Sequence, residues 1–174
     1  MNRSWMFVLA ASLLAAPASS QTLDASAELM RTLTEAPGPS AFEESVREIV
    51  VREFEDLGAD IRFDGLGSVL ATVPGGAGGP VVMVTAHLDE VGLMVQYITP
   101  DGFIRVKALG GWLRQALPDQ RWTILGSDGP VMGISGIRTV HVTPAAQRER
   151  AWALEEIFLD VGATSRDEVE AMGV

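Results

Sequence analysis

An almost continuous apolar run, Val81-Val82-Met83-Val84-Thr85-Ala86, constrains the fold of this chain more than any other stretch. A strand of this composition is typical of a sheet that is covered on both faces. Two stretches with apolar residues at helical spacing precede it, over residues 23–35 and 41–57. The second stretch has one apolar face, which suits packing on a sheet. The first half of the chain is therefore expected to form an α/β layer.

Turn and cap residues divide this half into elements. Proline and glycine within residues 36–39 are expected to end the first helix, because proline blocks its continuation. The sequence Ser40-Ala41-Phe42-Glu43 has the form of a capping box, in which a serine N-cap is followed three residues later by a glutamate. Gly58 is expected to end the second helix. Short strands are then expected at residues 60–64 and 68–73.

The pattern changes after Gly92. Short strands separated by turn residues favour a small barrel or sandwich. The expected strands are residues 93–98, 103–108, 121–125, 130–134 and 138–142.

Helical patterns return near the end of the chain. A helix is expected over residues 143–156, with Thr143 as N-cap and a proline at the first helical position. A strand over residues 157–161 and a second capping box at Ser165 then precede a last helix. These boundaries predict an α/β segment over residues 22–92, a β-rich insertion over 93–157 and the start of a return to the α/β domain over 158–174.

Residues 1–21 have the three parts of a secretory signal peptide. Arg3 supplies a positive start, an apolar run from Trp5 to Ala16 is too short to span a bilayer, and small residues follow. A buried N-terminal helix is the alternative. The chain has no cysteine, so an exported product would lack disulfides. We predict a periplasmic or secreted protein without a stable membrane anchor.

Composition narrows the function. With 174 residues the chain suits one domain or two small ones, and 47% hydrophobic residues exclude a disordered composition. The formal net charge is −10. Nucleic-acid binding requires basic clusters that neutralise phosphates, and this sequence has none. We therefore expect no nucleic-acid partner.

The candidate chemistry lies directly after the apolar run, in Ala86-His87-Leu88-Asp89-Glu90. In an extended segment, His87 and Asp89 point to the same side. Histidine is the commonest metal ligand, and a nearby carboxylate can orient its ring. Open α/β sheets also place their ligand sites at the carboxyl ends of strands. The alternative is a histidine at a strand end whose hydrogen-bonding needs are met by a neighbouring carboxylate. We assign no role to Glu90.

Other polar residues are weaker candidates. His141 could be a ligand, but a histidine within a strand of the β-rich region is the favoured interpretation. Glu155 and Glu156 are expected on a solvated helix face, and Asp160 is expected to hydrogen-bond locally. Motifs for a serine or cysteine nucleophile or for a phosphate loop are absent from the sequence.

Several longer motifs extend this interpretation, and they occur in order along most of the chain after residue 21. They are APGPSAFEE at residues 36–44, DGLGSVLA at 64–71, AHLDEVGLMV at 86–95, DGFIR at 101–105, LGGW at 109–112, LPDQR at 117–121 and FLDVGATS at 158–165. On these residues the chain resembles the M42 family of glutamyl-aminopeptidase-like metallopeptidases, whose older label is cellulase M or endoglucanase.

The resemblance implies an α/β metallopeptidase domain of the phosphorylase/hydrolase-like type, interrupted by a small β-barrel that mediates homo-oligomerisation. It implies that His87 is a metal ligand and that Asp89 orients this histidine as part of the catalytic machinery. The implied reaction removes N-terminal residues from peptide substrates. Two divalent metal ions, zinc or cobalt, would serve as cofactors, and a glutamate would act as general base.

The chain departs from the family pattern in three places. Alanine replaces the usual glycine at Ala41, which we expect to be tolerated as a position after an N-cap, and Ser68 replaces an asparagine. The family's remaining metal ligands lie beyond the last motif matched here. We therefore expect a truncated, N-terminal fragment of an exported aminopeptidase that is inactive on its own. A truncated, non-catalytic oligomerisation module is the alternative, while carbohydrate hydrolysis rests only on the older family label.

Overall fold

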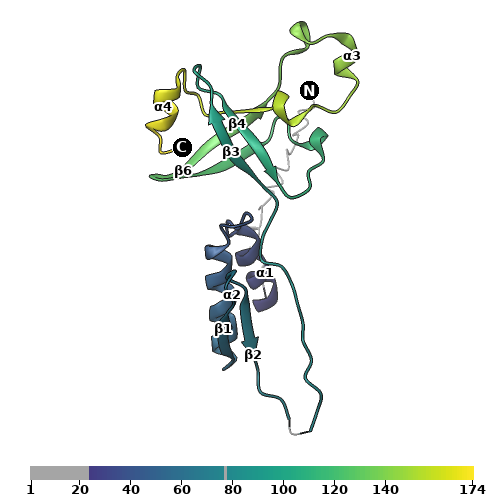
Figure 1. Ribbon diagram of the computed structural model, residues 1–174, viewed down its shortest axis with the longest axis vertical. Helices are drawn as coiled ribbons and strands as arrows, with labels where there is room; N and C mark the ends of the chain where they lie inside the picture. The colour runs from purple at the N-terminus through teal and green to yellow at the C-terminus, as the bar shows by residue number, and fades with distance from the viewer. Residues whose placement is uncertain (1–23, 77) are drawn as a thin grey trace, which may run out of the picture.

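The computed structural model describes residues 24–76 and 78–174, which form a helical part and a β-rich part (Figure 1). The helical part holds α1 (Ala25–Glu35), α2 (Glu44–Asp56) and the hairpin of β1 (Asp60–Phe63) and β2 (Val69–Thr72). The predicted signal peptide lies outside the described residues. Within those residues, every helix is too short or too polar to cross a membrane.

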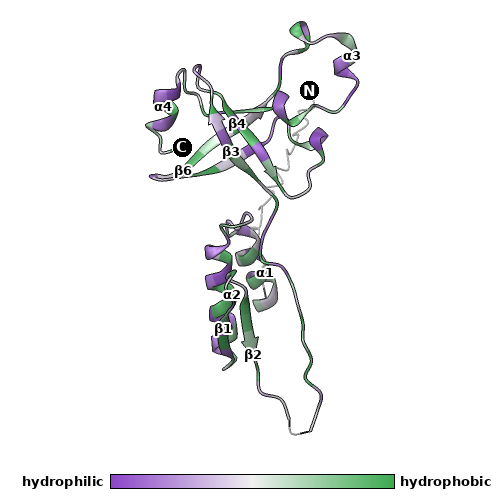
Figure 2. Cartoon of the chain, in the orientation of Figure 1, coloured by the Kyte–Doolittle hydropathy of each residue, from purple (hydrophilic) through white to green (hydrophobic). Residues whose placement is uncertain are grey.

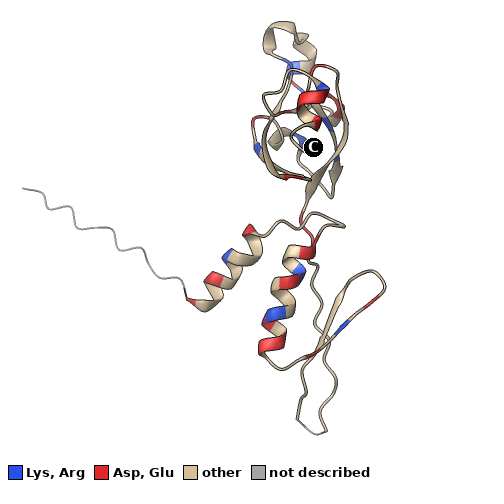
Figure 3. Cartoon of the chain, turned by 90° about the vertical axis from the view of Figure 1, so that its left-hand side faces the viewer, with Lys and Arg blue, Asp and Glu red and all other residues tan. Residues whose placement is uncertain are grey.

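Both predicted helices are present. The Asp24 carboxylate caps α1 by accepting a hydrogen bond from the Ala27 amide at 2.8 Å. Helix α2 carries charged side chains along its exposed surface (Figure 3) and buries Val46 toward the loop before it. Gly58 follows α2 with a φ of +71°, as expected of a glycine that ends a helix.

The predicted capping box at residues 40–43 does not form. Helix α2 begins at Glu44, and Ser40 lies in a turn closed by a 2.8 Å hydrogen bond from the Phe42 amide to the Pro39 carbonyl. Ala41 occupies this turn with a φ of +74°. We expected Ala41 to follow an N-cap, where a positive φ is not needed, and this premise was wrong: Ala41 is the third residue of a type II turn, which requires a left-handed backbone.

The apolar run at residues 81–86 is not a strand in this structure. It forms part of a long extended connection between β2 and β3 (Figures 1 and 2), and Val81 is 99% exposed. A strand requires hydrogen-bonding neighbours. In the described residues, β1 and β2 pair only with each other, and no strand lies beside this run. The predicted burial on both faces is therefore wrong for these residues.

The β-rich part contains one five-stranded antiparallel sheet with the order β3-β4-β7-β6-β5. Its strands are β3 (Gly92–Ile98), β4 (Ile104–Leu109), β5 (Arg121–Gly126), β6 (Gly129–Gly136) and β7 (Phe158–Asp160). The expected hairpins β3–β4 and β5–β6 are both present. The sheet curls around a core that contains Ile104, Val106, Ile124 and Leu159.

The predicted boundary between residues 157 and 158 falls inside this packed unit. β7 lies between β4 and β6, where Leu159 pairs with Ile104 on one side and with Ser135 on the other. Helix α4 (Arg166–Glu170) adds the fully buried Val169 to the same core. Ser165 caps α4 as predicted, by accepting a hydrogen bond from the Glu168 amide at 3.3 Å.

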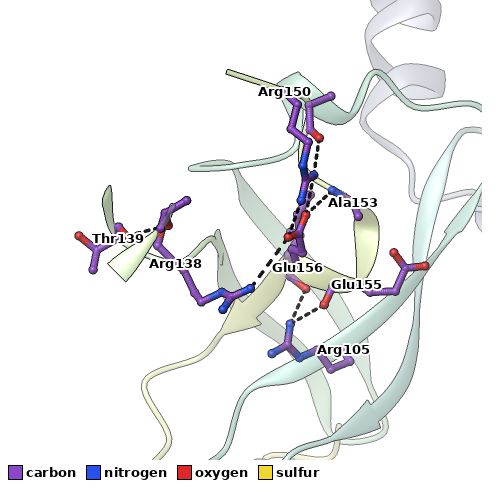
Figure 4. Close-up of polar contacts among 10 residues, drawn as sticks. Arg105, Arg138, Thr139, Arg150, Ala153, Glu155 and Glu156 are labelled. Carbon is purple, nitrogen blue, oxygen red and sulfur yellow. Dashed lines mark hydrogen bonds and ion pairs between the residues drawn. The ribbon is translucent and has the colours of Figure 1, made fainter. Parts of the chain in front are cut away.

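The segment before β7 differs from the predicted strand and long helix. It contains the short helices η2 (Val140–Val142), α3 (Ala145–Arg148) and η3 (Leu154–Glu156). Glu156 does not lie on a solvated helix face: both of its carboxylate oxygens accept hydrogen bonds from Arg150 at 2.9 Å, and Arg138 lies 3.9 Å away (Figure 4). Arg105 also donates to the Glu155 and Ile157 carbonyls, which ties this segment to β4.

Candidate metal centre

The segment that carries His87 and Asp89 is held against the loop before α2. The Glu90 amide donates to the Gly38 carbonyl at 2.8 Å, and the Gly38 amide donates to the Glu90 carboxylate at 3.0 Å. Gly38 is buried, and a Cβ there would lie 2.7 Å from the Val46 side chain. Only glycine permits this close approach without displacement of Val46. Glu90, to which the sequence assigned no role, is therefore a structural anchor.

His87 and Asp89 lie on the same side of the extended segment, as their spacing predicts. Nδ1 of His87 lies 2.8 Å from the Asp89 carbonyl oxygen and 3.0 Å from Oδ1 of the Asp89 carboxylate. Both oxygens can only accept, so Nδ1 carries a hydrogen, and in the neutral imidazole Nε2 then keeps its lone pair. The His87 side chain is 85% exposed, which leaves Nε2 accessible from solvent.

Ser40, in the loop before α2, contacts the Asp89 carboxylate from the side opposite His87. Its hydroxyl donates to Oδ2 of Asp89, the carboxylate oxygen that does not face His87. This hydrogen bond, followed by the one from His87, holds the pKa of the Asp89 carboxyl below its usual range, although partial burial opposes the shift. Asp89 therefore stays ionised and acceptor-only. Sequence reasoning missed Ser40, since its spacing to Glu43 suggested an N-cap and its partner lies 49 residues away.

The remaining candidates do not join this pair. His141 lies in η2 of the β-rich part and not in a strand, Glu156 is engaged by Arg150, and Asp160 accepts a local hydrogen bond from the Gly162 amide at 2.8 Å. In residues 24–76 and 78–174, no group of three or more histidine and acidic side chains could hold a metal ion.

The donor chemistry therefore fits a metal ion only in part. A neutral imidazole whose other nitrogen donates to a carboxylate is the usual form of a metal-ligating histidine. His87 has this form, and a divalent ion would bind at its Nε2. A catalytic zinc site takes about three protein ligands. The described residues bring together one such histidine and its carboxylate partner, which is fewer groups than a site of this kind requires.

Comparison with known proteins identifies a family for this chain. The sequence pattern of the family described as M42 glutamyl aminopeptidase matches residues 67–174. The lysyl aminopeptidase of Pyrococcus furiosus is 38% identical over 150 residues, which cover 84% of this chain and 42% of that protein. This chain spans about two fifths of the length of the curated relatives that it matches.

Solved structures show the same relationship. The TET aminopeptidase from a marine sediment archaeon, Thaumarchaeota archaeon SCGC AB-539-E09, superimposes with a TM-score of 0.80 at 38% identity, over 87% of this chain and 42% of that one. The Pyrococcus horikoshii TET1 peptidase, described as able to assemble into a tetrahedron or a large octahedral shell, gives a TM-score of 0.71 at 28% identity, over 83% and 43% of the two chains.

Proposed function

Because this chain belongs to the M42 glutamyl aminopeptidase family, we propose that it forms part of a metal-dependent aminopeptidase that removes N-terminal residues from peptides. The observation that supports this most directly is the His87–Asp89 pair, whose accessible Nε2 has the form of a metal ligand. The metal ions would be two divalent ions, zinc or cobalt, held by His87 together with ligands outside the described residues.

Asp89 would control both the tautomer of His87 and the charge around it. Asp89 accepts the Nδ1 hydrogen of His87 and keeps the ring in the tautomer whose Nε2 can coordinate. The negative charge of Asp89 would also attract a cation toward the imidazole. When bound, the metal ions supply Lewis acidity toward the scissile carbonyl and a nucleophilic water.

The sequence has two histidines, so a metal titration can compare the proposed ligand His87 directly with His141. In a zinc titration of the ¹⁵N-labelled full chain, we expect the Nε2 resonance of His87 to shift while His141 stays constant. His87→Ala should abolish the response, whereas His141→Ala, which removes the only other histidine, should preserve it. Equal responses of both histidines, or none from His87, would contradict the proposed ligand.

We expect the 174-residue chain to release product from aminoacyl p-nitroanilides only at the background rate. One imidazole with an orienting carboxylate cannot hold two ions tightly. Turnover by the purified chain that a chelator abolishes and zinc restores would show that these residues hold a working site, and would overturn this expectation.

The β-rich part is proposed as an oligomerisation unit inserted in the catalytic domain. Its support is a separate core around Ile104 and Leu159, together with the assemblies described for the Pyrococcus horikoshii TET1 peptidase. Light scattering after gel filtration should show a single defined homo-oligomer. The same core, and the single metal ligand, also favour a second candidate function, that of a non-catalytic oligomerisation module. A defined oligomer in which His87 fails to respond to zinc would support this candidate over the first.

Export is proposed from residues 1–21 alone. N-terminal sequencing of the protein recovered from cells should show a start near residue 22. An intact Met1 would exclude a cleaved signal peptide.

A further inference from the structure

We propose that Ser40 is a positioning residue for His87, which acts by fixing the rotation of the Asp89 carboxylate. This inference rests on the proposed metal-ligand role of His87. No sequence motif links Ser40 to Asp89. The link is a contact between two segments that lie 49 residues apart.

Asp89 has two acceptor oxygens with different partners. Oδ1 faces Nδ1 of His87 at 3.0 Å, and Oδ2 accepts the hydrogen bond from the Ser40 hydroxyl. The terminal torsion of an aspartate is broad, so a carboxylate without a second partner can rotate away from a histidine. The Ser40 hydroxyl holds Oδ2 in place, and therefore keeps Oδ1 directed at Nδ1.

The backbone of the Ser40 loop is anchored by other contacts. Gly38 and Glu90 exchange two hydrogen bonds, and the Phe42 amide closes the turn onto Pro39. Removal of the Ser40 hydroxyl alone leaves these bonds intact. A change at His87 in a Ser40 variant would thus report the lost hydroxyl and not a displaced loop.

The Asp89 carbonyl oxygen is the competing explanation for the tautomer of His87. It lies 2.8 Å from Nδ1 and could hold the hydrogen there without help from the carboxylate. If the backbone carbonyl were sufficient, loss of the Ser40 hydroxyl would leave the tautomer unchanged. The two explanations therefore differ in one measurable quantity.

The experiment measures the His87 tautomer ratio from the ¹⁵N shifts of the imidazole in the metal-free full chain, at a pH where the ring is neutral. We expect Ser40→Ala to lower the ratio of the Nδ1–H to the Nε2–H form about three- to tenfold, the range that corresponds to one hydrogen bond. Ser40→Thr, which keeps a hydroxyl, should restore most of the ratio. Ser45→Ala, on the exposed surface of α2, is the matched control and should leave the ratio at its wild-type value.

The amide shifts of Gly38 and Glu90 report whether the loop stays docked in each variant. An unchanged His87 ratio in Ser40→Ala, with the loop docked, would overturn the proposal in favour of the backbone carbonyl. A changed ratio that Ser40→Thr does not restore would overturn it as well. Because no metal is present, this result does not depend on the proposed function: failure of zinc to bind His87 would refute the ligand role and leave the tautomer result standing.

Discussion

Replacement of Ala41 by glycine should stabilise the loop that carries Ser40. Ala41 has a φ of +74° in the turn that the Phe42 amide closes onto Pro39. A left-handed backbone costs an L-residue about 1–2 kcal/mol, and glycine is free of this cost. Glycine also gives the unfolded chain more freedom, which offsets about 0.4–1 kcal/mol. The central values of these two ranges, about 1.5 and about 0.7 kcal/mol, leave a net gain of about 0.8 kcal/mol. The exposed Ala41 side chain loses little packing.

Hydrogen exchange of the Phe42 and Glu90 amides measures this gain locally, because each donates a bond that holds the loop. A gain of this size should slow their exchange about two- to fivefold. The matched control is Ala36→Gly at the end of α1, where φ is −72° and glycine relieves no strain. Faster or unchanged exchange in Ala41→Gly would refute the assignment of strain to Ala41.

Three further predictions concern the β-rich part. Gly102→Ala should lower the free energy of unfolding by about 2 kcal/mol in urea titrations, because φ is +84° and the new Cβ would lie 2.8 Å from the Ala163 carbonyl oxygen. Leu159→Ala should cost about 2–5 kcal/mol, since Leu159 is 3% exposed at the centre of the sheet, whereas Leu125→Ala on the exposed side of β5 should cost far less. The Arg150 hydrogen bond lowers the pKa of Glu156, with a smaller contribution from the Ala153 amide. The stabilisation is therefore present above the ordinary carboxyl pKa of about 4.3 and is lost as the pH falls through the lowered value. In the wild type, hydrogen exchange of the Ala153 amide should accelerate as the pH falls through the lowered pKa of Glu156. In Glu156→Gln the same amide should already exchange faster than in the wild type at neutral pH.

The sequence was sufficient to predict elements whose signals are local. Periodicity placed α1 and α2 to within a few residues, and the cap at Ser165 placed the start of α4. Turn residues identified the hairpins β3–β4 and β5–β6. The same-side geometry of His87 and Asp89 was also predictable, because it depends only on an extended backbone.

Predictions that depended on distant partners failed. The run at residues 81–86 has the composition of a buried strand, but composition cannot supply the neighbouring strands that pairing requires. Ser40 matched a capping box at short range, yet its hydroxyl binds Asp89 instead. Ala41 was misjudged because it lies in the turn from Pro39 to Phe42 and not at a helix N-terminus, and this turn sets its positive φ.

The position of β7 has a consequence for synthesis on the ribosome. β7 is the last of the five strands of this sheet in chain order, yet it lies between β4 and β6. Until it emerges, the β-rich part holds two separate hairpins, and isolated two-stranded hairpins are marginally stable in water. The β-rich part therefore cannot close its core progressively from its N-terminus. Its sheet must assemble late, when residues 158–160 pair with β4 of one hairpin and β6 of the other. Val169 then packs into the core.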